Sequence, residues 1–336
     1  MVNPPPDDDR EPPTTSGAIA VVSLHAQIGS LTAAAARTTS GWSAPQGAAE
    51  MAGAAEELLV LIDLLTLRGH VLGRIADYEQ AQDLAEWLVC NAPSDPTALL
   101  ARARTRATFH RFDEAAADLD CAETAGLDQA TLHAERAVIR QALGDHAQAQ
   151  ALYDSAAQRP PGFATLAALA VLHAEGGNPA EAEPLFAEAR RRYRGTSPFP
   201  VASLDFRHGL MWLRAGDLPT AYAWFDASRR RVPAYAPVLA RLADIDMTRG
   251  AHETAVARLS PLASSSDDPE YAAALAHALT ATGRLREAGQ HLATAAARYE
   301  QLAWSHPAAY ADHAADFRRD AMYAGFAGFA TRAGLP

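Results

Sequence analysis

The stretch HGLMWLRAGDLPTAYAWFDASRRRVP, His208–Pro233, contains two apolar runs of helical period separated by Gly216. Small residues stand at fixed places within it, Gly209 in the first run and Ala221 in the second. Two antiparallel helices approach to about 8–10 Å only where the facing side chains are small. A glycine between them permits the positive φ at which a helix ends. The stretch therefore predicts a helical hairpin.

The same small residues recur along the chain at a spacing of about 34 residues, which indicates a repeat architecture. Counting from Ala202 as position 1, Gly209 occupies position 8 and Ala221 position 20. Most steps are 33 or 34 residues, and a step of 39 before Ala221 contains the insert RRRYRGTSPFP. Position 8 holds Gly69, Ala103, Ala137, Ala170, Gly209, Ala243, Ala276 and Ala315, and position 20 holds Ala81, Ala115, Ala149, Ala182, Ala221, Ala255, Ala288 and Ala327.

Other positions of the unit agree with a pair of helices. Large residues such as Phe225 fill position 24, and Pro233 at position 32 ends the second helix. The turn within the pair is marked by Gly144, Gly177, Gly216, Gly250 and Gly283. In these features residues 62–336 resemble the tetratricopeptide repeat (TPR) family, although Trp212 stands at position 11 and the family's tryptophan at position 4 is absent. The resemblance implies an all-α fold, a right-handed α-solenoid of about eight TPR-like helical pairs.

The chain before residue 62 is predicted to have two parts. Residues 1–17 are rich in Pro and Asp and predict a disordered tail. Residues 18–61 contain two apolar helical segments and predict an N-terminal helical cap, a degenerate repeat that covers the exposed core of the first pair. The alternative is a separate small domain, but Ser40–Gly47 is only a loop, and no linker is found.

Composition narrows the classes of partner. The formal net charge of −11 argues against nucleic acid and anionic membranes, which both need a basic face. The longest apolar stretches, such as Ala18–Ala26, are too short to cross a membrane, and no basic region precedes an apolar run as in a secretory signal. Cys90 and Cys121 form no disulfide framework and no metal-ligand spacing. A cytoplasmic protein without a cofactor or a metal is expected.

The resemblance places positions 2, 5, 9, 12 and 13 of each unit on the concave wall of the solenoid. Along this wall the residues are basic at the start, apolar in the middle and acidic with a histidine at the end. Such a surface suits a bound segment. The candidate groove residues are His70, Arg74, Arg104, Phe206, Leu210, Leu213, Arg214, Asp244, Met247, Thr248, Glu270, His277, Thr280, Asp312, Asp316 and Asp320.

Three functional hypotheses follow from this wall. The first is a scaffold that binds a protein or peptide segment without chemistry of its own. The second is a small-molecule-binding protein or enzyme, in which His277 lies between Asp244 and Asp316 and acts as an acid–base catalyst. The third is a regulatory peptide sensor. A solvated acidic wall without a special role is the simpler interpretation of those three residues.

Overall fold

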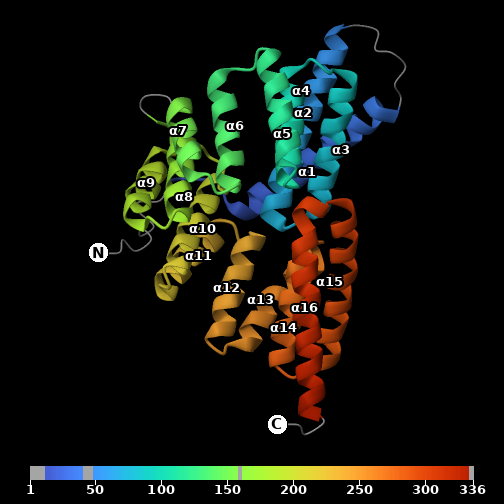
Figure 1. Cartoon of the computed structure of the whole chain (residues 1–336), viewed down its shortest axis with the longest axis vertical. Coiled ribbons are helices and arrows are strands. Elements are labelled where there is room, and N and C mark those ends of the chain that lie inside the picture. Colours follow the sequence, from blue (N-terminus) through green and yellow to red (C-terminus); the bar gives the residue numbers. More distant parts are fainter. Residues whose placement is uncertain (1–11, 41–47, 158–160, 333–336) are drawn as a thin grey trace.

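The computed structural model describes residues 12–40, 48–157 and 161–332, with side chains over 12–36, 53–157 and 161–319. Sixteen helices and no strand occupy these described ranges (Figure 1). The helices are α1 (Gly17–Ser40), α2 (Ala48–Leu72), α3 (Ile75–Asn91), α4 (Pro96–Thr108), α5 (Phe112–Thr124), α6 (Gln129–Ala142), α7 (His146–Ala156), α8 (Phe163–Glu175), α9 (Pro179–Arg192), α10 (Phe199–Arg214), α11 (Leu218–Arg231), α12 (Ala236–Thr248), α13 (His252–Ser265), α14 (Pro269–Ala281), α15 (Leu285–Ser305) and α16 (Pro307–Arg332).

Consecutive helices pack in pairs, from α2 with α3 to α14 with α15, so the predicted all-α solenoid is confirmed. The alanines at position 20 are buried from Ala81 to Ala288. A Cβ on Gly209 would lie 2.6 Å from the Phe225 ring, which explains why position 8 of this unit holds glycine. The turn after α10 contains Gly216 at φ 79°, a backbone conformation that favours glycine.

The two ends of the array depart from the predicted frame. The step from Ala276 to Ala315 is again 39 residues, and Ala315 is exposed whereas Ala314 is buried. α16 runs without interruption through the place where an eighth turn was expected, so seven pairs are followed by one long helix. In the first pair the turn comes early, because Gly73 (φ 64°) follows Gly69 by four residues rather than seven.

The prediction of a disordered tail is wrong for residues 12–16. Residues 12–16 lie against the end of α11 and the loop before α10. The amide of Thr15 donates to the carbonyl oxygen of Thr196 at 2.8 Å. Arg231 Nη1 donates to Thr14 Oγ1 at 3.0 Å, which ties this segment to α11. Residues 1–11 lie outside the described ranges.

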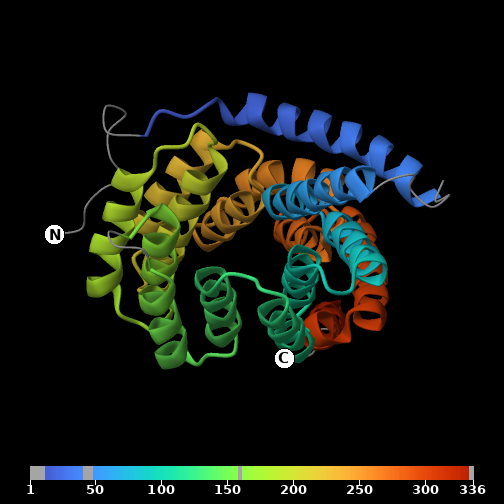
Figure 2. The same cartoon turned by 90° about the horizontal axis from the view of Figure 1, so that it is seen from above.

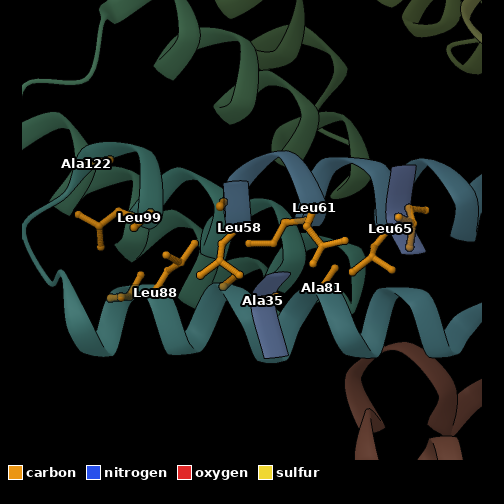
Figure 3. Packing of buried hydrophobic residues seen from close by; sticks show 14 of the residues in the cluster. Ala35, Leu58, Leu61, Leu65, Ala81, Leu88, Leu99 and Ala122 are labelled. Atoms are coloured by element: carbon orange, nitrogen blue, oxygen red, sulfur yellow. The ribbon is translucent and has the colours of Figure 1, made fainter. Parts of the chain in front are cut away.

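α1 and the first half of α2 occupy the residues of the predicted N-terminal cap. Leu24 and Ile28 of α1 are buried in one cluster with Leu58, Leu61 and Leu65 of α2. Figure 3 shows these three α2 leucines directed into the space between the helices. Residue 62, predicted as the boundary of the solenoid, lies inside α2, so the cap and the first pair share one continuous helix.

α1 also has the length and composition of a membrane-spanning helix. Gly17–Ala36 has a mean hydropathy of 1.5, so the expectation that every apolar stretch is too short needs correction. That expectation considered only uninterrupted apolar stretches. His25 and Gln27 interrupt the apolar stretch of α1, but neither adds a formal charge. Signal sequences and buried core helices pass the same test, so the composition of α1 alone assigns it to no membrane.

The superhelix completes a turn, so that α12–α16 lie against α2–α5 (Figures 1 and 2). These contacts join residues that are 165 to 219 positions apart in the chain. We call them the closure interface. Its contacts are His70 with Tyr235, Gly73 with Ser266, Ala76 with Asp267, Glu79 with Arg298 and Phe109 with His306.

Candidate functional site

A cavity on the concave side lies in the middle of the wall, over the first helices of three successive pairs. α6, α8 and α10 line it, and its volume is about 470 Å³. These helices follow one another at the spacing of the repeat, which brings their inner faces side by side. We call this cavity the concave groove. Its apolar lining includes Val138, Phe163, Ala167, Val171, Pro200 and Leu204.

A polar network crosses one side of the concave groove. The hydroxyl of Tyr153 donates to Gln141 Oε1 at 3.0 Å, and Gln141 Nε2 donates to Glu175 Oε2 at 2.6 Å. Arg207 and Arg214 each lie 3.9 Å from Glu175 Oε1. Burial raises the pKa of Tyr153 to about 12, which keeps its hydroxyl protonated as a donor. The network fixes Glu175 and leaves the two half-exposed guanidinium groups at the groove edge.

The predicted basic start of the wall is already engaged within the protein. His70 Nε2 lies 2.6 Å from the hydroxyl of Tyr235. Arg74 lies 3.5 Å from Asp77, and Arg104 lies 2.6 Å from Glu135. The structure therefore does not present His70, Arg74 and Arg104 as one unpaired basic surface, because each of them contacts a polar partner within the protein. Phe206, predicted in the apolar middle of the wall, is packed in the core around α10 and α12.

His70 makes the stability of the fold depend on pH. Burial, aided by the charge of Arg207, lowers the pKa of His70 from 6.5 to about 4. Between these two values the unfolded chain binds a proton that the folded chain does not. The stabilisation from the neutral imidazole is complete above pH 6.5. It is lost as the pH falls toward 4, by about 1.4 kcal/mol per pH unit.

We expect His70→Gln to remove this dependence, because glutamine can accept from Tyr235 and does not titrate. The free energy of unfolding of the parent should fall relative to that of His70→Gln as the pH drops from 6.5 to 4. Urea denaturation of both proteins across this window measures the difference. Burial raises the pKa of Asp268 to about 6, which acts in the opposite direction in both proteins and therefore cancels. A difference that stays constant with pH would contradict the expectation.

The structure does not join His277 to its two predicted carboxylates. Asp244 is paired with Arg241 at 2.7 Å, and Asp316 with Arg319 at 2.6 Å. His277 is exposed, and among the described side chains it has no hydrogen bond or ion pair with either aspartate. Over the same residues no group of three or more His, Cys, Asp or Glu is placed to hold a metal. A preformed acid–base site is therefore not found there.

The other predicted residues of the acidic end make separate contacts. Glu270 shares Arg241 with Asp244, at 2.6 Å. The hydroxyls of Thr248 and Thr280 each donate to a carbonyl oxygen of their own helix. Asp312 is exposed, and the side chain of Asp320 lies outside the described residues.

The predicted apolar middle is partly packed into the core. Leu210 and Leu213 are half-buried against the core of α10–α12, and Met247 is half-buried against that of α12–α14. Of the predicted residues in this region, Arg214 contributes to the network beside the concave groove.

Sequence reasoning missed most of the residues of the concave groove. Gln141 stands at position 12 of its unit and Glu175 at position 13 of the next, both among the positions assigned to the wall. Applying those positions to the third and fourth units would have found them. Tyr153 lies on a second helix and Arg207 at position 6, so no such signal pointed to these two.

Comparisons with known proteins find solved structures that have a similar fold. No family model matches, and no curated protein matches in sequence. Yeast Tom70 matches 85% of this chain and 68% of its own, with a TM-score of 0.52 and 10% identity. The human IFIT1 dimer with PPP-AAAA matches 72% of this chain and 58% of its own, with a TM-score of 0.52 and 16% identity. A tetratricopeptide repeat protein from Parabacteroides merdae matches 75% of this chain and 93% of its own, with a TM-score of 0.44 and 16% identity.

Proposed function

Because the chain has the helical-repeat fold of tetratricopeptide repeat proteins, we propose that it is a scaffold that binds a segment of another protein. The observation that carries the proposal is the position of the concave groove, which spans three first helices and runs across the repeats. A volume of about 470 Å³ accommodates a few side chains of an extended segment. Fold alone does not establish function, so the groove itself supports this proposal.

The chemistry of the concave groove indicates what such a segment contains. Its floor is apolar, which favours one or more aliphatic or aromatic side chains. Arg207 and Arg214 share the single carboxylate of Glu175, so positive charge is in excess at this edge. We therefore propose a segment with an acidic residue close to its apolar ones. The partner's charge would complement this edge although the whole chain carries a formal net charge of −11.

A catalytic function based on His277 has less support. Both candidate carboxylates are paired with arginines rather than with the imidazole. The absence of a cofactor and a cytoplasmic location stay predictions, as does the exclusion of nucleic acid and membrane as partners.

The experiment is selection of binding peptides from a random library on the full chain, followed by two charge substitutions. Val138 is 50% exposed in the concave groove, and Leu285 is 62% exposed at the start of α15, far from it. We expect Val138→Asp to weaken the selected peptides at least tenfold, because it places a carboxylate on the apolar floor and opposes their acidic residue. Leu285→Asp is the matched control and should leave their affinity unchanged.

Both substitutions are at exposed positions, so both proteins should fold, which far-UV circular dichroism checks. Selected peptides that bind the Val138→Asp protein as well as the parent would refute the concave groove as their site. A selection that yields no binding peptide would refute the proposed function.

A further inference from the structure

A second cavity lies deeper in the superhelix than the concave groove. Its volume is about 220 Å³, and it is half enclosed. Its walls come from α2, the start of α10, and the turn between α11 and α12. The apolar lining includes Leu67, Val71, Phe199 and Val232. Pro200 and Ser203 line both cavities, so the deep cavity adjoins the concave groove.

The polar groups of the deep cavity form one chain of hydrogen bonds. Tyr235 hydrogen-bonds both Ser203 and, at 2.6 Å, His70 Nε2. Burial raises the pKa of Tyr235 to about 12 and lowers that of His70 to about 4, so both groups are neutral at pH 7. The tautomer of His70 sets the direction of this chain, because the 2.6 Å contact carries either the phenol proton to Nε2 or the Nε2 proton to the phenol oxygen.

This chain leaves the oxygen of Ser203 able to bind a ligand. A hydroxyl has one proton and two acceptor lone pairs, and the contact with Tyr235 uses at most one lone pair of Ser203. Its oxygen can therefore accept a hydrogen bond from a donor in the cavity. A charged ligand is disfavoured, because the remaining walls are apolar and the imidazole and phenol are neutral.

The volume sets the size of the ligand. An apolar protein cavity of about 150 Å³ holds benzene. A cavity of about 220 Å³ holds a group about half as large again, which corresponds to a fused two-ring compound or a substituted phenol. The aromatic residues Phe199 and Tyr235 in the lining suit a planar ring.

We propose that the deep cavity binds a small uncharged aromatic compound with one hydrogen-bond donor, of the indole or phenol class, whose N–H or O–H donates to Ser203. This site is distinct from the peptide scaffold function. Because α2 and α12 are joined across the closure interface, a ligand held between them would also stabilise the closed superhelix.

The test uses the full chain with ¹³C-labelled methyl groups, titrated with indole and followed by NMR. We expect saturable binding of one indole. Intermolecular NOEs should link its ring protons to the methyl groups of Leu67, Val71 and Val232. Benzothiophene, which has a similar shape but no N–H, serves as the non-donating comparison.

Two variants test the parts of the site, and a third is their control. Ser203→Ala should weaken indole binding about three- to tenfold while leaving benzothiophene binding unchanged, since only indole donates to the hydroxyl. Ala202→Leu, which fills the deep cavity, should abolish binding of both compounds. Ala168→Leu, a matched change that lines only the concave groove, should leave both bindings unchanged.

Two results would overturn the proposal, and neither depends on a variant. One is a parent chain that shows no saturable indole binding up to the solubility limit. The other is a set of NOEs to methyl groups outside the deep cavity only. Peptide binding in the concave groove could still be observed in either case, so the scaffold function would be judged separately.

Discussion

Replacing Asp205 with alanine is expected to lower the free energy of unfolding by about 3–5 kcal/mol, because it removes the carboxylate of a buried ionic cluster. The Asp205 side chain is 1% exposed, and the flanking side chains of Arg190 and Arg231 are 9% and 5% exposed. Arg190 hydrogen-bonds this carboxylate, and Arg231 Nε lies 3.9 Å from its second oxygen. The variant would bury both guanidinium charges without the anion that they share.

The measurement is chemical denaturation followed by circular dichroism, with Asp316→Ala as the control. Asp316 is also paired with an arginine, but both side chains are about 60% exposed, so its removal should change stability by less than about 1 kcal/mol. A second readout is limited proteolysis, since Arg231 also holds Thr14. Cleavage near Thr14 should become faster in the Asp205 variant only. Equal losses of stability in the two variants would contradict the buried cluster.

Ile28→Asp is expected to destabilise the protein by about 3–5 kcal/mol or to prevent its folding. Ile28 is 2% exposed where α1 packs on α2, so an aspartate there would remove apolar contact and bury a carboxylate. Ile19 lies in the same helix and is 63% exposed. Ile19→Asp is therefore a control with identical chemistry, and its stability should stay close to that of the parent.

This pair also tests the environment of α1. Thermal unfolding and sedimentation of both variants would show whether loss of the cap leads to aggregation through the exposed leucines of α2. If the two substitutions destabilise the protein equally, α1 is not packed on α2 as described.

The helical pairs could be predicted because their determinants are local. A close crossing of two adjacent helices requires a small side chain, and Ala221, buried beside Gly209 and Phe225, meets that requirement within 34 residues of sequence. The same rule failed at Ala315, because alanine is also a good residue for a long single helix such as α16. Alanine alone cannot distinguish a crossing from an uninterrupted helix.

The candidate site was predictable only in part, because its contacts depend on the whole superhelical turn. His70 was predicted on the concave wall, but its hydrogen bond to Tyr235 joins residues 165 positions apart and could not be predicted. The ion pair between Arg241 and Asp244 could have been predicted from the sequence, because the two residues are three positions apart on one helix. A local ion pair competes better for that carboxylate than a histidine on the next pair.

The closure interface limits how the gene for such a protein can change in length. In an open array each repeat contacts only its neighbours, so one unit can be lost or duplicated without disturbing the others. Here Glu79 meets Arg298, and Gly73 meets Ser266, only after the intervening pairs have completed the turn. Deleting or duplicating one of these pairs would offset the two surfaces by the width of a unit and separate every contact between them. The closed superhelix therefore requires a fixed number of repeats between α2 and α12, in addition to a suitable sequence in each repeat.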